Sequence, residues 1–245
     1  MPHRFFIPKN CITPPVVQLP ADVARQVKTV LRMQPGDKIV VLDNSGTAWQ
    51  VKLTEVSKSA VRGQIVDQQP AAGEPELHLT LYQGTLKAQK FEWVLQKGTE
   101  LGVSRFVPTI CQRSVVRDRN VLLKKHNRWL QIVREAAEQS GRGKLPELQP
   151  AMSLAEALTD AQSAELVLMP WEEATGVSLS TALAEPTAAT IALFIGPEGG
   201  FAAIETTNAQ RAGVNLITLG PRILRAETAG LVACAAIMYQ AGELQ

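Results

Sequence analysis

The chain has 245 residues, of which 45% are hydrophobic and 20% are charged. This composition is typical of an ordinary globular protein and excludes disordered, collagen-like and coiled-coil chains. No apolar run approaches the roughly 18 residues that a membrane span requires, and the first residues lack the apolar region and cleavage site of a secretory signal. We therefore expect a cytoplasmic protein. The three cysteines and three histidines are scattered along the chain, so neither a disulfide framework nor a metal site is expected.

The net charge of +2 hides two segments of opposite sign. Residues 105–144 contain ten basic and three acidic side chains, whereas residues 145–215 contain nine acidic side chains and one basic side chain. Segregated basic charge is typical of a surface that binds phosphates. A pair of well-solvated helices is the alternative interpretation of this basic stretch.

The first part of the chain, residues 1–72, predicts a small β-rich domain. One helix and three strands are expected, over residues 21–32, 38–42, 49–56 and 60–66. The last two strands alternate apolar and polar residues, which is the pattern of half-buried strands, and residues 43–46 have the composition of a hairpin turn. We interpret this domain as a small barrel. The segment 68–75, with two prolines and a glycine, is the best linker candidate.

The second part, residues 73–245, alternates strands with helices, which predicts a mostly parallel sheet covered by helices on both faces. Strands are expected over residues 77–83, 106–110, 165–169, 190–195 and 214–219. Helices are expected over residues 87–101, in a long basic segment that includes 122–137, after residue 200, and over residues 228–239.

A glycine-rich loop, GPEGG at residues 196–200, directly follows one of the expected strands. Ligands bind at the carboxyl ends of strands in such sheets, and glycines allow a backbone to approach a ligand closely. The loop matches neither the G-x-G-x-x-G fingerprint nor a P-loop. A tight turn between strand and helix is the alternative interpretation.

A second loop, LGPRILRAETAG at residues 219–230, follows the next strand. Glu227 and Thr228 suit the start of a helix, but that role does not explain Arg222 and Arg225. Two such loops at neighbouring strand ends predict a ligand site. A serine hydrolase is excluded because there is no G-x-S-x-G motif.

Together these loops resemble the C-terminal signature of the RsmE family, the ribosomal small-subunit RNA (uracil-N3)-methyltransferases of the SPOUT class. The resemblance extends over the whole chain. Its other motifs are RFF at residues 4–6, VLR at 30–32 with GD at 36–37, QKGTELGV at 96–103 and EAAEQSGR at 135–142. Family members often carry histidine just before VLR. Here that stretch is ADVARQV, so Arg25 is the residue expected to supply charge there.

The resemblance implies an α/β fold in which a PUA-like β-barrel for RNA binding precedes a SPOUT-type parallel-sheet methyltransferase domain tied in a trefoil knot. It also implies a homodimer and S-adenosylmethionine as cofactor. The implied activity is methylation of N3 of one uridine in small-subunit ribosomal RNA, and the substrate is either that RNA or an assembled 30S subunit.

The resemblance also implies site residues. Expected to bind the cofactor are Leu168, Met169, Gly196, Pro197, Gly199, Gly200, Leu219, Gly220, Ile223, Leu224 and Thr228. A uracil N3 is protonated at neutral pH, so a base must take its proton or cations must stabilise the resulting anion. Arg222 or Arg225 is expected to stabilise that charge, and Glu227 or Glu198 to accept the proton. Expected to contact RNA are Arg4, Arg25, Arg32, Arg113, Arg117 and Arg142.

Two alternatives stay open. In the first, the protein is a non-catalytic RNA-binding assembly factor that keeps the fold as a scaffold. In the second, it is a knotted enzyme that methylates the ribose 2′-hydroxyl. Cofactor binding distinguishes the first alternative from an enzyme, and the identity of the methylated nucleoside distinguishes the second.

Overall fold

The computed structural model describes residues 2–184 and 188–244. The chain forms two compact units. Unit 1 contains the chain up to Glu74 together with Ala137–Leu145, and unit 2 contains Pro75–Ala136 and the chain from Pro146 onward. The predicted boundary lies between residues 72 and 73, with 137–145 in the second part. In the structure, this segment is grouped with the first compact unit.

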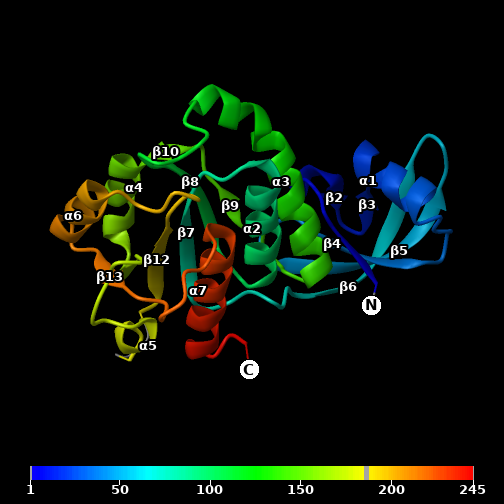
Figure 1. The fold of residues 1–245 in the computed structure, drawn as a ribbon. Coiled ribbons are helices and arrows are strands. Elements are labelled where there is room, and N and C mark those ends of the chain that lie inside the picture. Colours follow the sequence, from blue (N-terminus) through cyan, green and yellow to red (C-terminus); the bar gives the residue numbers. More distant parts are fainter. Residues whose placement is uncertain (1, 185–187, 245) are drawn as a thin grey trace. The chain divides into compact units, whose positions relative to one another are not determined.

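Unit 1 is built on a six-stranded sheet with the order β1-β4-β5-β6-β3-β2 (Figure 1). Its strands are β1 (His3–Phe6), β2 (Ile12–Thr13), β3 (Val16–Gln18), β4 (Lys38–Leu42), β5 (Thr47–Val56) and β6 (Val61–Pro70). β1 runs parallel to β4, and the other neighbours are antiparallel. β6 extends to Pro70, so the expected linker begins as strand.

Alternation along the strands gives unit 1 two apolar faces. Ile39 and Val41 of β4 pack into one cluster with Phe5, whereas Val40 packs on the opposite face with Phe6 and Ala137. The helix expected over residues 21–32 is shorter in the structure and changes from α-helical to π-helical along its length. It consists of α1 (Ala21–Arg25) and a π-helical turn, η2 (Gln26–Val30), and a short 3-10 turn, η1 (Lys9–Cys11), precedes it.

Unit 2 contains a seven-stranded sheet with the order β10-β8-β7-β12-β11-β13, in which β9 also pairs with β8. Its strands are β7 (His78–Gly84), β8 (Arg105–Ile110), β9 (Glu147–Leu148), β10 (Met152–Ser153), β11 (Leu166–Pro170), β12 (Thr190–Ile195) and β13 (Asn215–Ile217). All pairings in this sheet are parallel. The parallel sheet predicted from the alternation is therefore confirmed.

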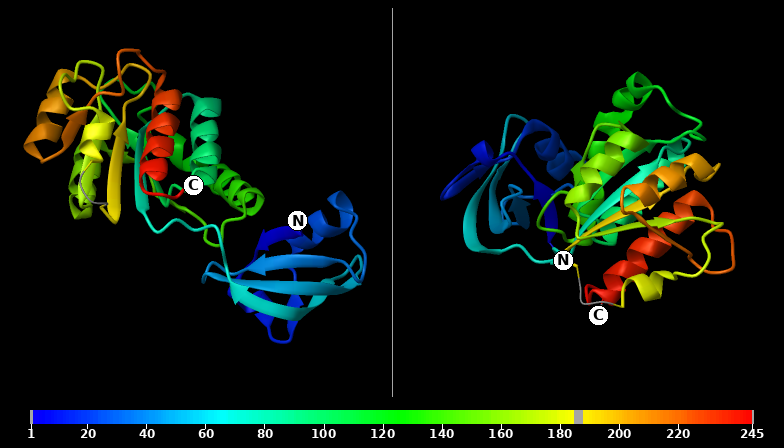
Figure 2. Two further views of the ribbon diagram at one scale, coloured as in Figure 1. Left: turned by 90° about the horizontal axis from the view of Figure 1, so that it is seen from below. Right: turned by 90° about the vertical axis from the view of Figure 1, so that its left-hand side faces the viewer.

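Helices cover both faces of the unit 2 sheet (Figures 1 and 2). One layer consists of α2 (Ala88–Glu100), α3 (Arg119–Ser140) and α7 (Ala226–Gln240), and the other contains α4 (Leu154–Asp160) and α6 (Ala203–Arg211). The remaining helices are the short α5 (Leu179–Ala182) and the 3-10 turn η3 (Ala161–Ser163). Leu79 and Leu81 of β7 pack under the first layer, whereas Tyr82 packs under the second. This alternation is the period of two that a strand buried on both faces shows.

Within residues 2–184 and 188–244, no helix is long and apolar enough to cross a membrane. Over the same residues, no group of three or more histidine, cysteine, aspartate or glutamate side chains is placed to hold a metal ion.

Candidate functional site

A cavity of about 890 Å³ opens at the edge of the unit 2 sheet where the strands β11, β12 and β13 end. Its wall consists of the residues that follow these three strands, together with Lys90 of α2 and the first turn of α7. Because the strands are parallel, their carboxyl ends meet at this edge, which is where ligands bind in such sheets. The two loops singled out in the sequence therefore form one site.

Most of the predicted site residues line this cavity. They are Gly196, Pro197, Glu198, Gly199, Gly200, Leu219, Gly220, Arg222, Ile223, Leu224, Arg225 and Glu227.

Three predicted cofactor residues do not line it. Leu168 and Met169 are fully buried, one on each face of the sheet, because the alternation of β11 directs both into the core. The cavity wall begins one residue later, at Pro170, and on α7 it includes Glu227 and Ala229 but not Thr228 between them. The prediction was wrong for Leu168 and Met169 as lining residues, and segment 170–176 takes their place.

The GPEGG loop packs tightly against its surroundings. A Cβ atom at Gly84, the last residue of β7, would lie 2.4 Å from the backbone nitrogen of Pro197. Gly200 has a φ of +67°, and a Cβ there would lie 2.6 Å from a carboxylate oxygen of Glu172. Glycine is required at Gly84, because backbone atoms approach it closely, and is favoured at Gly200 by the left-handed conformation.

The loop after β8 supports the GPEGG loop from the other side. Arg113 Nη1 donates a hydrogen bond to the Gly199 carbonyl oxygen at 3.0 Å. The buried Glu205 accepts from the backbone N–H groups of Gln112 at 2.7 Å and Ala202 at 2.9 Å. Arg113 was predicted to contact RNA, and the structure shows that it also contacts the backbone of the glycine loop.

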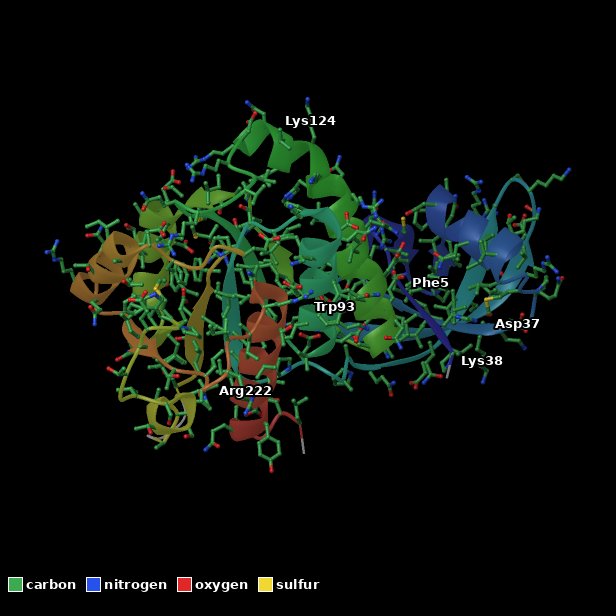
Figure 3. All side chains as sticks on the ribbon, viewed as in Figure 1. Phe5, Asp37, Lys38, Trp93, Lys124 and Arg222 are labelled. Atoms are coloured by element: carbon green, nitrogen blue, oxygen red, sulfur yellow. The ribbon has the colours of Figure 1, made fainter. Side chains whose placement is uncertain are left out.

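The second loop offers backbone donors to the cavity. Gly220 has a φ of +99°, and its N–H bonds to the Thr218 hydroxyl at 3.1 Å. Over the described residues, the N–H groups of Ile223 and Leu224 have no partner within the protein. Arg222 (Figure 3) and Arg225 are exposed, and neither side chain makes a hydrogen bond or ion pair within this part of the chain. These donors and cations are available to a ligand.

A lysine and two carboxylates meet on the cavity wall. Lys90 Nζ lies 3.2 Å from Glu227 Oε1 and 3.9 Å from Glu198 Oε1. Glu198 Oε1 also accepts the N–H of Lys87 at 3.2 Å. Lys90 was not among the predicted site residues. Its place in the chain was the available signal, because α2 starts just after β7 and therefore at the same edge of the sheet.

Several arginines of the basic stretch are paired inside unit 2. Arg105 Nη1 contacts Asp160 at 2.6 Å, and Arg128 Nε contacts Glu92 at 2.6 Å. The Arg105 hydrogen bond is the main cause that lowers the pKa of Asp160. Arg119 pairs with Glu156, whose pKa falls to about 2, chiefly through hydrogen bonds from Ser153 and then through Arg119.

The RNA-contact prediction is wrong for Arg142. Its side chain is 4% exposed and forms an ion pair with Glu74 at 2.9 Å within unit 1. Arg4 is half-buried, and its Nη2 donates to the Arg142 carbonyl oxygen at 3.3 Å. In contrast, Arg25, Arg32 and Arg117 are exposed. Burial removes Arg142 from any surface, whereas these three side chains are accessible.

Comparisons with known proteins agree with this geometry. Residues 73–238 match the model of an RNA methyltransferase domain, and residues 21–66 match that of an RNA methyltransferase PUA domain. A Bacillus subtilis protein named ribosomal RNA small subunit methyltransferase E is 33% identical over 92% of this chain and 91% of its own length.

Two solved structures are similar over 98% of both chains. One is a ribosomal RNA small subunit methyltransferase E from Neisseria gonorrhoeae bound to S-adenosylmethionine, with 33% identity and a TM-score of 0.87. The other is a putative methyltransferase from Legionella pneumophila in complex with the same cofactor, with 29% identity and a TM-score of 0.89. On the strength of both domain matches and the near full-length relatives, this chain belongs to the ribosomal RNA small subunit methyltransferase E family.

Proposed function

We propose that the protein uses S-adenosylmethionine to methylate N3 of a uridine in small-subunit ribosomal RNA. The observation that carries the proposal is the single cavity formed by the GPEGG loop and the Arg222–Glu227 segment. Two solved structures that are similar to this chain contain that cofactor. A ribosomal RNA substrate would place the activity in the cytoplasm.

The residues of the cavity fit this cofactor. A volume of about 890 Å³ lies within the range of roughly 300–1,000 Å³ for small-molecule sites. The backbone N–H groups of Ile223 and Leu224 are available to an adenine ring or a carboxylate. The Glu172 carboxylate lies against Gly200 at the same wall, where it suits a ribose hydroxyl or an amino group.

When bound, S-adenosylmethionine supplies a methyl group on a positively charged sulfur. The protein's own task is then to hold the uracil in line with that methyl group and to manage the N3 proton. Among the described residues that line the cavity, Arg222 and Arg225 are the two cations without an ion pair, so we assign them to the uracil carbonyl oxygens, on which negative charge develops. Of the three carboxylates at the wall, we assign Glu227 or Glu198 to accept the proton.

RNA contacts are proposed for the accessible basic residues of each unit. In unit 1, Arg25 and Arg32 flank the π-helical turn and are exposed. In unit 2, Arg113 and Arg117 lie on the loop after β8, next to the GPEGG loop. Such cations contact phosphates without regard to sequence. The target base would turn out of its stack to reach the cavity.

A homodimer and a trefoil knot belong to the same proposal. Exposed apolar side chains on α7, Val232 at 46% and Tyr239 at 63% exposure, support a contact with a second copy of this helix. Light scattering on the purified protein tests this state, because a dimer has twice the mass of 26.6 kDa.

The direct test is to incubate the protein and S-adenosylmethionine with small ribosomal subunits from cells that lack this gene. The RNA is then digested and its nucleosides are identified by mass spectrometry. We expect new 3-methyluridine, and none without the cofactor. A 2′-O-methyl product would overturn the N3 chemistry. RNA binding without product, and without calorimetric binding of the cofactor, would favour a non-catalytic assembly factor.

A further inference from the structure

The start of α3 is firmly held in unit 2. Arg119, its first residue, pairs with Glu156 of α4. Leu122 is buried in the core that α2 and α3 cover, and Arg128, further along the helix, pairs with Glu92 of α2 at 2.6 Å. Because both helix layers and the core hold this segment, the fold fixes which of its side chains face the solvent.

One exposed face of this segment combines apolar, amide and cationic side chains. Leu123 is 63% exposed. Asn120 and Asn127, three residues before it and four after it, are exposed on the same side of the helix. Lys124 is exposed next to them, and Figure 3 shows its side chain pointing away from the sheet. We call these four residues the α3 face.

The composition of the α3 face fits RNA. Residues 119–134 contain five basic residues and no acidic residue. An apolar side chain can pack against an unstacked base, amides can bond to base edges, and a lysine can contact a phosphate. Two copies of this chain that met through the α3 face would bring like charges together, which is unfavourable. The charge therefore favours RNA over a second copy as the occupant.

The α3 face lies at the same edge of the sheet as the cavity. The loop that leads to α3 follows β8, and the GPEGG loop follows β12. In the sheet β7 lies between these strands, so the two loops begin two strand spacings apart, or about 10 Å. Arg113 bridges them through its bond to Gly199 at 3.0 Å, and Arg117 is exposed further along the same loop. RNA with its target base in the cavity can follow this edge to α3.

We infer that the α3 face binds the RNA beside the target nucleotide. This inference rests on the proposed function. The RNA chain runs along the carboxyl edge of the sheet from the cavity to α3. Leu123 packs against a base, Asn120 and Asn127 bond to base edges, and Lys124 contacts a phosphate. The α3 face therefore distinguishes bases, which phosphate contacts alone do not do.

The variant Leu123→Ala tests the apolar contact, and the fold does not depend on this exposed side chain. We expect the Kd for small ribosomal subunits from cells that lack this gene to rise about tenfold. The slope of log Kd against log salt concentration should stay unchanged, because no charge is removed. Lys124→Met should instead reduce that slope by about one phosphate contact. The Kd for S-adenosylmethionine should be unaffected in both variants, since neither residue lines the cavity.

The matched control is Leu130→Ala. Leu130 is 42% exposed and lies on the same side of α3 as Leu123, but about 10 Å further along the helix from the edge of the sheet. The Kd for small ribosomal subunits should therefore stay at the wild-type value. An equal loss of affinity in Leu123→Ala and Leu130→Ala would overturn the inference, as would wild-type affinity in Leu123→Ala.

Photo-crosslinking identifies what the α3 face touches. A photoreactive p-benzoylphenylalanine at position 123 should crosslink to RNA in the complex with small ribosomal subunits. A crosslink to a ribosomal protein, or between two copies of this chain, would overturn the inference. Wild-type protein that makes no 3-methyluridine would overturn the proposed function itself. If 3-methyluridine forms and Leu123→Ala binds as tightly as the wild type, this inference alone fails.

Discussion

The two glycine-containing loops and the basic stretch of residues 105–144 both suggested a ligand surface, but only the loops form a common site in the structure. The loops meet at one cavity. The basic stretch is divided among internal partners, with Arg105, Arg119 and Arg128 paired in unit 2 and Arg142 buried in unit 1. A loop's place follows from the strand that precedes it, whereas the partner of a charged side chain comes from distant parts of the chain. Local motifs therefore located the site better than a count of charges.

The largest effect is expected for Arg225→Ala, which tests whether the second glycine-containing loop takes part in catalysis. Arg225 is exposed at the cavity, and its side chain has no hydrogen bond or ion pair among the described residues, so its removal should not disturb the fold. Loss of one donor to a developing charge typically lowers kcat by about 10²–10³-fold. We expect that loss in methyl-transfer assays, with the calorimetric Kd for S-adenosylmethionine nearly unchanged. Equal losses of turnover and cofactor affinity would contradict a role in catalysis.

The basic stretch is tested by Arg142→Met. Because Arg142 is buried and pairs with Glu74, the free energy of unfolding should fall by about 3 kcal/mol, near the lower end for a broken buried ion pair. Urea unfolding measures this change. The control is Arg117→Met, which should leave stability within about 0.5 kcal/mol and reduce the salt dependence of RNA binding by about one phosphate contact. The opposite pattern would restore Arg142 as an RNA contact.

Sequence patterns predicted the features that depend on local periodicity. The alternation of strands with helices over residues 73–245 indicated a sheet covered on both faces, and the glycines at 196–200 and 220 marked the strand ends that form the site. The short strands β1, β2, β3, β9 and β10 were missed because a segment of two to four residues shows no clear period.

Features that depend on the exact end of an element, or on distant contacts, were not predictable. Leu168 and Met169 were expected at the cavity, but the wall begins one residue later, and an error of one position at a strand end is ordinary. The last turn of α3 packs with unit 1 although its sequence continues that of the helix in unit 2. Lys90 was missed because its partners lie 108 and 137 residues further along the chain.

A smaller effect is expected for Gly84→Ala, which tests how firmly the loop packing fixes the cavity. The added Cβ would meet the backbone of Pro197 at 2.4 Å and of Gly196 at 2.7 Å. Backbone atoms cannot move aside as a flexible side chain can, so the free energy of unfolding should fall by about 1–3 kcal/mol. Cofactor affinity should fall as well, because the GPEGG loop has to shift. An unchanged calorimetric Kd in a destabilised variant would show that the cofactor does not depend on the position of this loop.

The smallest effect is expected for Arg32→Gly. This variant tests whether the exposed Arg32 side chain of unit 1 contributes to RNA binding at the expense of stability. Arg32 has a φ of +52°, a conformation that costs a non-glycine residue about 1–2 kcal/mol. Glycine removes that cost but loses more chain entropy on folding, by roughly 0.5–1 kcal/mol, so the net stability should rise by up to about 1 kcal/mol. RNA affinity should fall, with a shallower salt dependence. Gain in thermal stability together with loss of RNA affinity would mean that the strained backbone is kept for RNA binding. If RNA affinity were unchanged, the RNA surface of unit 1 would lie elsewhere. The exposure of a basic side chain would then predict an RNA contact no better than the count of charges did in residues 105–144.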